Sequence, residues 1–273
     1  MHRIEGLYAE SGRFKDSPPG TRVTDDWLNA VQEELCGIIS AAGLTVASAA
    51  TDTWGQIWPA VAALAGTPSK GYVAFATPAS GGTWWPASYG RALGDKVTIH
   101  VVGAGGGGGG ASAVQTAHGG GAGGYGLSLH TLSAFNLNSG ITITIGSGGA
   151  GGASGAFSGI NGTTTSFGTY ITATGGIGGN KGTVYEYAAG GTCTGANILN
   201  NTGSWGMTTV ENYVGGCGGN SPFGGGGGLA PRYAQALNGS PGTAPGAGGG
   251  GASRTATAQA GGAGANGIVL ILW

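Results

Sequence analysis

Apolar and polar residues alternate along much of the chain from Gly71 onward. Short runs of this kind are typical of β-strands, because successive side chains of a strand point to opposite faces of the sheet. The runs are Val97–Val102, Leu127–His130, Ile141–Ile145, Tyr170–Thr174 and Ile268–Trp273. Turn-forming residues such as Asn161 and Gly162 lie between some of them. The pattern predicts a β-rich domain over residues 71–273.

The first 70 residues follow a helical pattern instead. Apolar residues recur there at spacings of three and four, which places them on one face of a helix. They are Trp27, Val31, Leu35 and Ile38. Thr24 suits the N-cap and Gly43 a natural stop, whereas Pro59 would break or kink a second helix. Such short helices bury their own apolar stripes poorly, so we expect residues 1–70 to join copies of the chain into a homotrimer, or else to dock on another protein.

Blocks of glycine separate the predicted strands, as at Gly105–Gly110 and Gly224–Gly228. Glycine has no Cβ, so extended polyproline-II-like segments of glycine can lie close together and form hydrogen bonds between their backbones. The alternative is that each block is a flexible linker. Linkers would not be expected to recur between short strands throughout one domain. We therefore expect a mainly β fold, in which a short N-terminal helical region precedes a glycine-rich β-sandwich-like domain with polyglycine II-like segments.

The composition tests whether such a chain folds at all. Gly 65 and Pro 10 together make 75 of the 273 residues, a share that suggests disorder in an aperiodic chain. Disordered chains, however, combine low hydrophobicity with high net charge. This chain is 40% hydrophobic, carries a formal net charge of −1 and contains seven tryptophans. A folded protein is therefore expected.

The sparse charge also limits the partners. Beyond Lys96 the basic residues are Lys181, Arg232 and Arg254, too few for the basic stripe that nucleic-acid binding needs. No apolar run of about 18 residues is present, and the N-terminus lacks the apolar core of a signal peptide, so we expect synthesis in a cytoplasm. The three cysteines, an odd number, are expected to be free thiols, although a Cys193–Cys217 bridge stays open.

Groups that could perform catalysis are scarce in the predicted β-domain. Cleavage of a polysaccharide usually needs two placed carboxylates. Glu186 and Glu211 form the available pair, and nothing in their spacing indicates that they face each other. Several glycine runs imitate phosphate-binding loops, but Lys181 is followed by glycine where the motif needs Ser or Thr. We therefore expect neither enzymatic activity nor a cofactor.

Several segments resemble one family. Trp27–Cys36 (WLNAVQEELC) resembles the N-terminal part of tail fibre proteins in Mu-like and related phages and prophages. Val97–Gly110 (VTIHVVGAGGGGGG) and the closing GANGIVLILW are similar to the glycine-rich domain that ends many phage tail fibres. The resemblance implies a host-recognition fibre in the virion tail whose glycine-rich domain presents variable loops. The His-x-His motifs by which some trimeric fibre tips hold iron are absent, so no metal is expected.

Inserts of unequal length interrupt the glycine pattern, and the longest are Asn180–Ala189, Cys193–Val214 and Leu229–Pro245. Their large aromatics and one arginine suit recognition, because aromatic side chains give contact area at low entropic cost. The predicted receptor-binding residues are Tyr185, Tyr187, Trp205, Tyr213, Arg232 and Tyr233. The leading hypothesis is an adhesin that binds a host-surface polysaccharide, lipopolysaccharide or outer-membrane protein and attaches to other tail or baseplate proteins. The alternatives are a purely structural fibre component and a polysaccharide depolymerase.

Overall fold

A computed structural model describes residues 9–10, 13–14, 31, 34, 36–37, 71–78, 82–133, 139–182, 187–208, 214–228, 237–254 and 257–273. Contacts divide the chain into two compact units, Met1–Ser69 and Lys70–Trp273. In the first unit, β1 (Ala9–Glu10) pairs antiparallel with β2 (Arg13–Phe14). The helical region predicted around Trp27 lies largely outside the described residues, so it stays a prediction.

The second unit contains two antiparallel sheets of five strands each, in the orders β11-β6-β5-β12-β3 and β10-β9-β8-β7-β4. The strands of the first sheet are β3 (Tyr72–Phe75), β5 (Lys96–Val102), β6 (Tyr125–Thr131), β11 (Leu199–Asn201) and β12 (Ile268–Leu272). Those of the second are β4 (Thr83–Trp84), β7 (Ile141–Thr144), β8 (Thr165–Phe167), β9 (Ile171–Ala173) and β10 (Cys193–Thr194). A 3-10 helix, Pro86–Tyr89, follows β4. The mainly β fold that the sequence predicts is confirmed.

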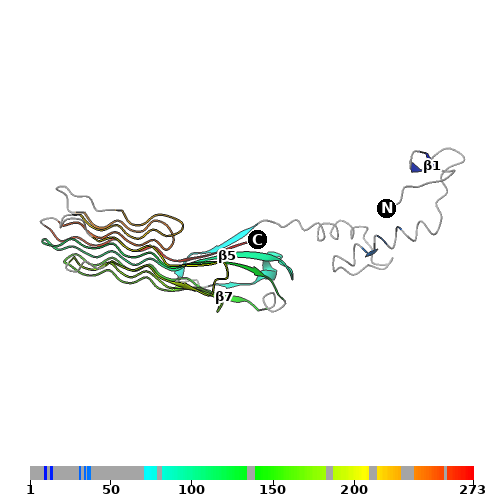
Figure 1. Cartoon of the computed structure of the whole chain (residues 1–273), viewed down its shortest axis with the longest axis horizontal. Helices are drawn as coiled ribbons and strands as arrows, with labels where there is room; N and C mark the ends of the chain where they lie inside the picture. The colour runs from blue at the N-terminus through cyan, green and yellow to red at the C-terminus, as the bar shows by residue number, and fades with distance from the viewer. Residues whose placement is uncertain are drawn as a thin grey trace. The chain divides into compact units, whose positions relative to one another are not determined.

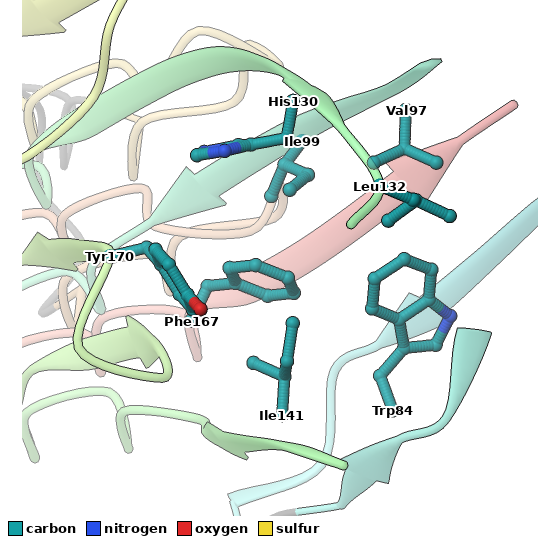
Figure 2. A pocket seen from close by; sticks show the side chains of 8 residues that line it. All are labelled: Trp84, Val97, Ile99, His130, Leu132, Ile141, Phe167 and Tyr170. Carbon is teal, nitrogen blue, oxygen red and sulfur yellow. The ribbon is translucent and has the colours of Figure 1, made fainter. Parts of the chain in front are cut away.

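The two sheets enclose the apolar core. Buried and exposed residues alternate along β7, and every second residue of β12 is buried, which gives each strand one inward face. Figure 2 shows these inward side chains pointing toward one another, with Trp84 and Ile141 on one side and Val97 and Ile99 on the other. The rings of Trp84 and Phe167 are 5.8 Å apart, and the space left between the lining residues is too small for a water molecule. The alternation read from the sequence therefore marks a real core.

The glycine blocks continue directly from the strands as extended segments. Figure 1 shows them running side by side away from the sheets. The segment 103–111, which follows β5, donates its backbone N–H groups in strict rotation to three neighbours: Gly103 to Gly124, Ala104 to Thr163 and Gly105 to Ala265, and so on to Ala111. A three-residue rotation is the geometry of the polyproline II helix. The polyglycine II-like segments are thereby confirmed.

The segments pack as a bundle with an inner and an outer layer. The segment 103–111 also accepts hydrogen bonds from three further segments, so it is bonded to six. The segments 117–124 and 246–252 are likewise each bonded to six others. Nine outer segments surround these three: 147–155, 157–163, 174–181, 188–192, 202–208, 215–220, 225–228, 238–243 and 259–267. Hydrogen bonds between backbones thus replace side-chain contacts as the cohesion of the bundle.

Close approach of backbones explains the glycines of the inner segments. A Cβ built on Gly105 would overlap the carbonyl oxygen of Ala247, and one on Gly107 would overlap that of Ala150. Neither residue has a positive φ, so lack of space, and not backbone conformation, demands glycine there. The block Gly224–Gly228 is mixed: Gly224 and Gly225 turn with positive φ, whereas a Cβ added to Gly228 would meet only the Ser240 hydroxyl, at an ordinary contact distance of 3.8 Å.

Candidate recognition surface

Most reversals of the chain in the bundle occur at its distal end, the end away from the two sheets. The described connection 112–116 lies there, and Ala111 just before it is bonded to Gln259 and Gly155 of two other segments that turn at the same end. The connections that join outgoing to returning segments are 112–116, 154–156, 182–187, 208–214, 229–237 and 254–258. Only the turns 221–224 and 244–246 lie beside the sheets among the described residues. One end therefore collects six connections of unequal length.

Four of these connections contain stretches outside the described residues, and the three longest stretches are 183–186, 209–213 and 229–236. The described residues that flank them fix where they begin and end. Asn180 accepts a hydrogen bond from His118 at 3.1 Å and Met207 accepts one from Gly119 at 3.1 Å, close to the connection 112–116. Gly239 donates to Ala260 at 2.8 Å, beside the distal residue Gln259. These three stretches therefore start and finish at the distal end.

The structure describes two of the six predicted receptor contacts, Tyr187 and Trp205, and it brings them together. Their ring centroids lie 5.6 Å apart with an interplanar angle of 42°, and each side chain is 60% exposed. The pairing of Ala188 with Gly206 holds the two rings side by side on adjacent segments. Trp205 lies in the outer segment 202–208 on the side of the bundle, and Tyr187 is the last residue of the connection 182–187. The other four, Tyr185, Tyr213, Arg232 and Tyr233, lie outside the described residues.

One of the four predicted attachment residues, Val31, lies among the described residues. Trp27, Leu35 and Ile38 lie outside the described residues, and Val31 is half-buried. Their role in forming a homotrimer or in binding another protein stays a prediction.

Part of what the sequence indicates as loop is structured. The insert Cys193–Val214 contains β10, β11 and the outer segment 202–208. Asn197 within it bonds to the backbone of Leu129 twice, accepting from the N–H at 3.0 Å and donating to the carbonyl at 2.8 Å. Asn200 forms the equivalent two bonds with Ala196. These side-chain amides therefore stabilise the fold. The sequence did not reveal β11, because all three of its residues are exposed and show no alternation of apolar and polar residues.

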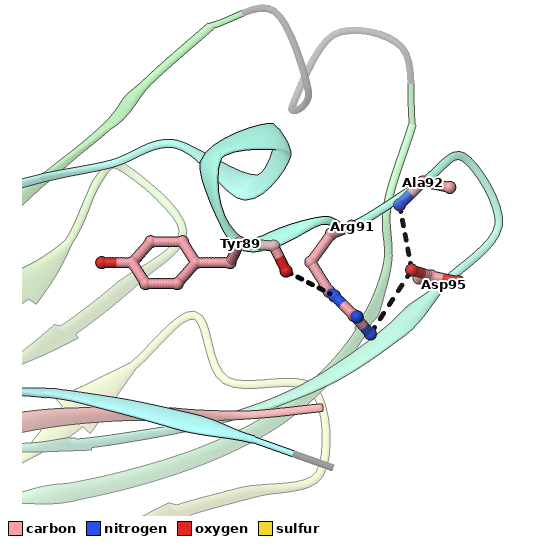
Figure 3. Close-up of polar contacts among 4 residues, drawn as sticks. All are labelled: Tyr89, Arg91, Ala92 and Asp95. Atoms are coloured by element: carbon pink, nitrogen blue, oxygen red, sulfur yellow. Dashed lines mark hydrogen bonds and ion pairs between the residues drawn. The ribbon is translucent and has the colours of Figure 1, made fainter. Parts of the chain in front are cut away.

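The charged residues Arg91 and Asp95 serve the scaffold of the second unit. Figure 3 shows Arg91 donating to the carbonyl of Tyr89, while Asp95 accepts from the N–H of Ala92 at 2.9 Å and lies 3.6 Å from the Arg91 guanidinium. Arg91 also lies over the ring of Trp273, 5.5 Å from its centroid. These contacts fix the loop that enters β5. The described residues of this unit contain no pair of acidic side chains. Glu186 and Glu211 lie outside the described residues.

Burial shifts the pKa of two histidines and one cysteine. It lowers the pKa of His100 and of His130, which favours neutral imidazole, and it raises the pKa of the Cys193 thiol. Cys36, Cys193 and Cys217 are all free. The described residues contain no group of three or more His, Cys, Asp or Glu side chains that could hold a metal ion, and no helix among them is long and apolar enough to cross a membrane.

Comparison with known proteins agrees with this architecture. A family model described as a glycine-rich domain matches residues 77–273, which covers the whole bundle and every strand of the two sheets except β3. No curated protein matches the chain.

Proposed function

We propose that this chain, which belongs to the glycine-rich domain family, is a bacteriophage tail-fibre or tail-tip adhesin that binds a host cell-surface receptor with the distal end of its bundle. The observation that carries the proposal is the collection of six connections of unequal length at that end. Binding residues are often found on loops that a rigid scaffold positions. The resemblance of the N-terminal segment Trp27–Cys36 to phage tail fibres supports the same assignment.

The bundle suits this role because its loops start from fixed points. The segments that flank the connections are each hydrogen-bonded to at least three others, so the backbone at the base of each connection has little freedom left to lose. Pre-organisation of this kind lowers the entropic cost of binding. Tyr185, Tyr213, Arg232 and Tyr233 are the proposed receptor contacts, since they occupy the three longest connections. Large aromatics and arginine are the residue types that dominate binding energy at interfaces.

The receptor would be a polysaccharide, a lipopolysaccharide or an outer-membrane protein. With few charges near the site, binding should depend on stacking, apolar contact and hydrogen bonds, and should therefore change little between low and moderate salt. In the particle, Trp27, Val31, Leu35 and Ile38 would join the copies or attach them to tail or baseplate proteins. The proposal includes no catalytic step and no nucleic-acid partner.

The test is binding of the labelled full-length chain to a panel of bacterial strains, before and after removal of surface polysaccharide or protein. We expect saturable binding to some strains, and loss of at least nine-tenths of it when Arg232→Ala and Tyr233→Ala are combined. Phe223→Ala is the matched control, because Phe223 is an exposed aromatic at the opposite end of the bundle. Undiminished binding after all three long connections are replaced by glycine-serine links would refute the site. Binding only to particle proteins would favour a structural role, and release of polysaccharide fragments would favour an enzyme.

A further inference from the structure

The side of the bundle carries an unusual group of exposed apolar residues. We call it the apolar face, and its members are Phe157, Ile160, Ile177, Tyr187, Trp205 and Met207. Their side chains are between 43% and 61% exposed. None of them lies at a turn beside the sheets; Tyr187 is the last residue of the distal connection 182–187, and the other five lie in outer segments. A group of this size on a stable protein is a sign of a covered surface.

The face is continuous because the segments that carry it are consecutive in the outer layer. Gly159 donates to Gly179, which joins 157–163 to 174–181. Ile177 donates to Ala189, which joins 174–181 to 188–192. The N–H of Gly206 bonds to the carbonyl of Ala188 at 2.8 Å, which joins 188–192 to 202–208, and the rings of Tyr187 and Trp205 touch across that last pair. Four neighbouring segments thus form one surface along the bundle.

The rest of the outer layer differs sharply. The described residues of 147–153, 215–220, 225–228, 238–243 and 259–267 include no exposed large apolar side chain. The exposed Val114 and Phe223 lie at turns, at the distal end and beside the sheets respectively. A random scatter of apolar residues would not be confined to four adjacent segments. The asymmetry points to a contact that one side of the bundle makes.

The chemistry of the face favours a dry protein contact over a sugar. Some of the polar side chains that lie among the apolar ones are already bonded to backbone: Asn161 accepts from the N–H of Gly178 at 2.8 Å, and Ser158 accepts from the N–H of Lys181 at 3.4 Å. Thr174 accepts from the N–H of Thr192 at 2.8 Å. A sugar needs hydrogen-bonding groups beside its aromatic platform. Aromatic residues and methionine without charge are instead typical of the core of a protein interface.

We propose that the apolar face is the contact between parallel copies of this chain, so that the bundles themselves associate. Lys181 is the one charged residue among the described residues of the four segments. Two copies that meet at this face would therefore experience little electrostatic repulsion. From typical side-chain areas the six residues expose roughly 500 Å². A standard interface buries about 800 Å² per partner, of which the centre is apolar. The face has the size of such a centre, and its straight segments allow two copies to lie along each other.

The inference does not depend on receptor binding, and it is tested on the full-length chain. A photo-crosslinking amino acid in place of Ile160 reports contact at the face directly, whatever the N-terminal region does. We expect crosslinked dimers whose joined peptides come from residues 157–208, and no such product when the same amino acid replaces Val114. Adding Trp205→Ser and Ile177→Ser should reduce the crosslinked product at least tenfold, while Val114→Ser with Phe223→Ser should not.

These variants change exposed side chains only, so the melting temperature is expected to stay unchanged, and circular dichroism verifies the fold. Absence of crosslinked dimers in the otherwise unaltered chain at micromolar concentration would overturn the proposal. So would crosslinking that the Trp205→Ser and Ile177→Ser changes leave undiminished. Crosslinking to a different protein in purified particles, without any between copies, would assign the face to that protein and equally overturn it.

Discussion

The substitution Gly107→Ala tests whether close backbone packing holds the bundle together. Gly107 lies in the inner segment 103–111, and its N–H bonds to the carbonyl of Ile160 at 2.9 Å. A Cβ there would overlap the carbonyl oxygen of Ala150 and lie 2.8 Å from that of Gly149. Because these are backbone atoms of a packed neighbour, no side-chain rotation relieves the overlap. The segment 147–153 has to move outward by roughly an ångström to restore an ordinary contact of about 3.3 Å between carbon and oxygen.

That movement weakens three hydrogen bonds of the displaced segment. They run from Gly149 to Gly105 at 2.9 Å, from Gly152 to Gly108 at 2.8 Å and from Ile160 to Ala150 at 2.9 Å. At a net worth of about 1 kcal/mol each, the loss is about 3 kcal/mol. Replacing glycine by alanine returns about 0.4–1 kcal/mol by restricting the unfolded chain. The expected destabilisation is therefore about 2–3 kcal/mol, or roughly 4–12 °C in melting temperature for a unit of this size.

Differential scanning calorimetry of the full-length chain measures the effect, and Gly228→Ala is the matched control. At Gly228 the nearest atom to an added Cβ is the Ser240 hydroxyl at 3.8 Å, and φ is not positive. Alanine fits there, so the control should melt at or slightly above the temperature of the unaltered protein. If Gly107→Ala melts within about 1 °C of the control, close packing of the inner glycines contributes little and the reasoning fails.

Three further predictions concern the sheets. Trp84→Ala should cost about 3–5 kcal/mol in a denaturant titration, because Trp84 is fully buried between the sheets; a cost under about 1 kcal/mol would contradict the described core. Asn197→Ala should lower the free energy of unfolding by about 1–2 kcal/mol, because Asn197 forms two hydrogen bonds with the backbone of β6. Asn201→Ala is the control and should change it little. Equal losses in the two variants would refute the structural role of Asn197. Burial lowers the pKa of His100 and His130 in the folded protein below the value of about 6.5 that histidine has in the unfolded chain. Below that pH the unfolded chain therefore binds more protons than the folded protein. Stability should be fully present above that pH and fall as the pH drops below it; melting temperatures at pH 7.5 and 5.5 should therefore differ less when both residues are changed to Gln.

The sequence predicted the strands that bury one face. β7 and β12 alternate in burial as their residues alternate in polarity, so the period of two was informative. β11 gave no such signal, because all three of its residues are exposed. Its pairing with β6 depends on backbone contacts and on Asn197, which bind residues almost 70 positions apart. Local pattern cannot report a pairing that distant residues create.

The candidate sites show the same division. Loop length and aromatic content indicated Tyr187 and Trp205 individually. Their contact follows from the pairing of Ala188 with Gly206, which sits in a stretch with no periodic signal. The sequence also gave no sign that Phe157, Ile160 and Ile177 share a surface with them, since the order of segments in the outer layer joins residues far apart in the chain.

The sheets supply what a glycine run lacks, which is information about register. Any glycine of a uniform block could bond to any other, and glycine loses more conformational entropy on ordering than other residues do. Here the pairing of Val102 with Tyr125 at the end of β5 and β6 continues without a break into the bond from Gly103 to Gly124. The apolar core thus fixes the alignment of these segments at one end, and the rotation of hydrogen bonds carries it along the bundle. Connections at the distal end then lie beyond the aligned part, so their lengths and side chains can vary without changing the register on which the fold depends.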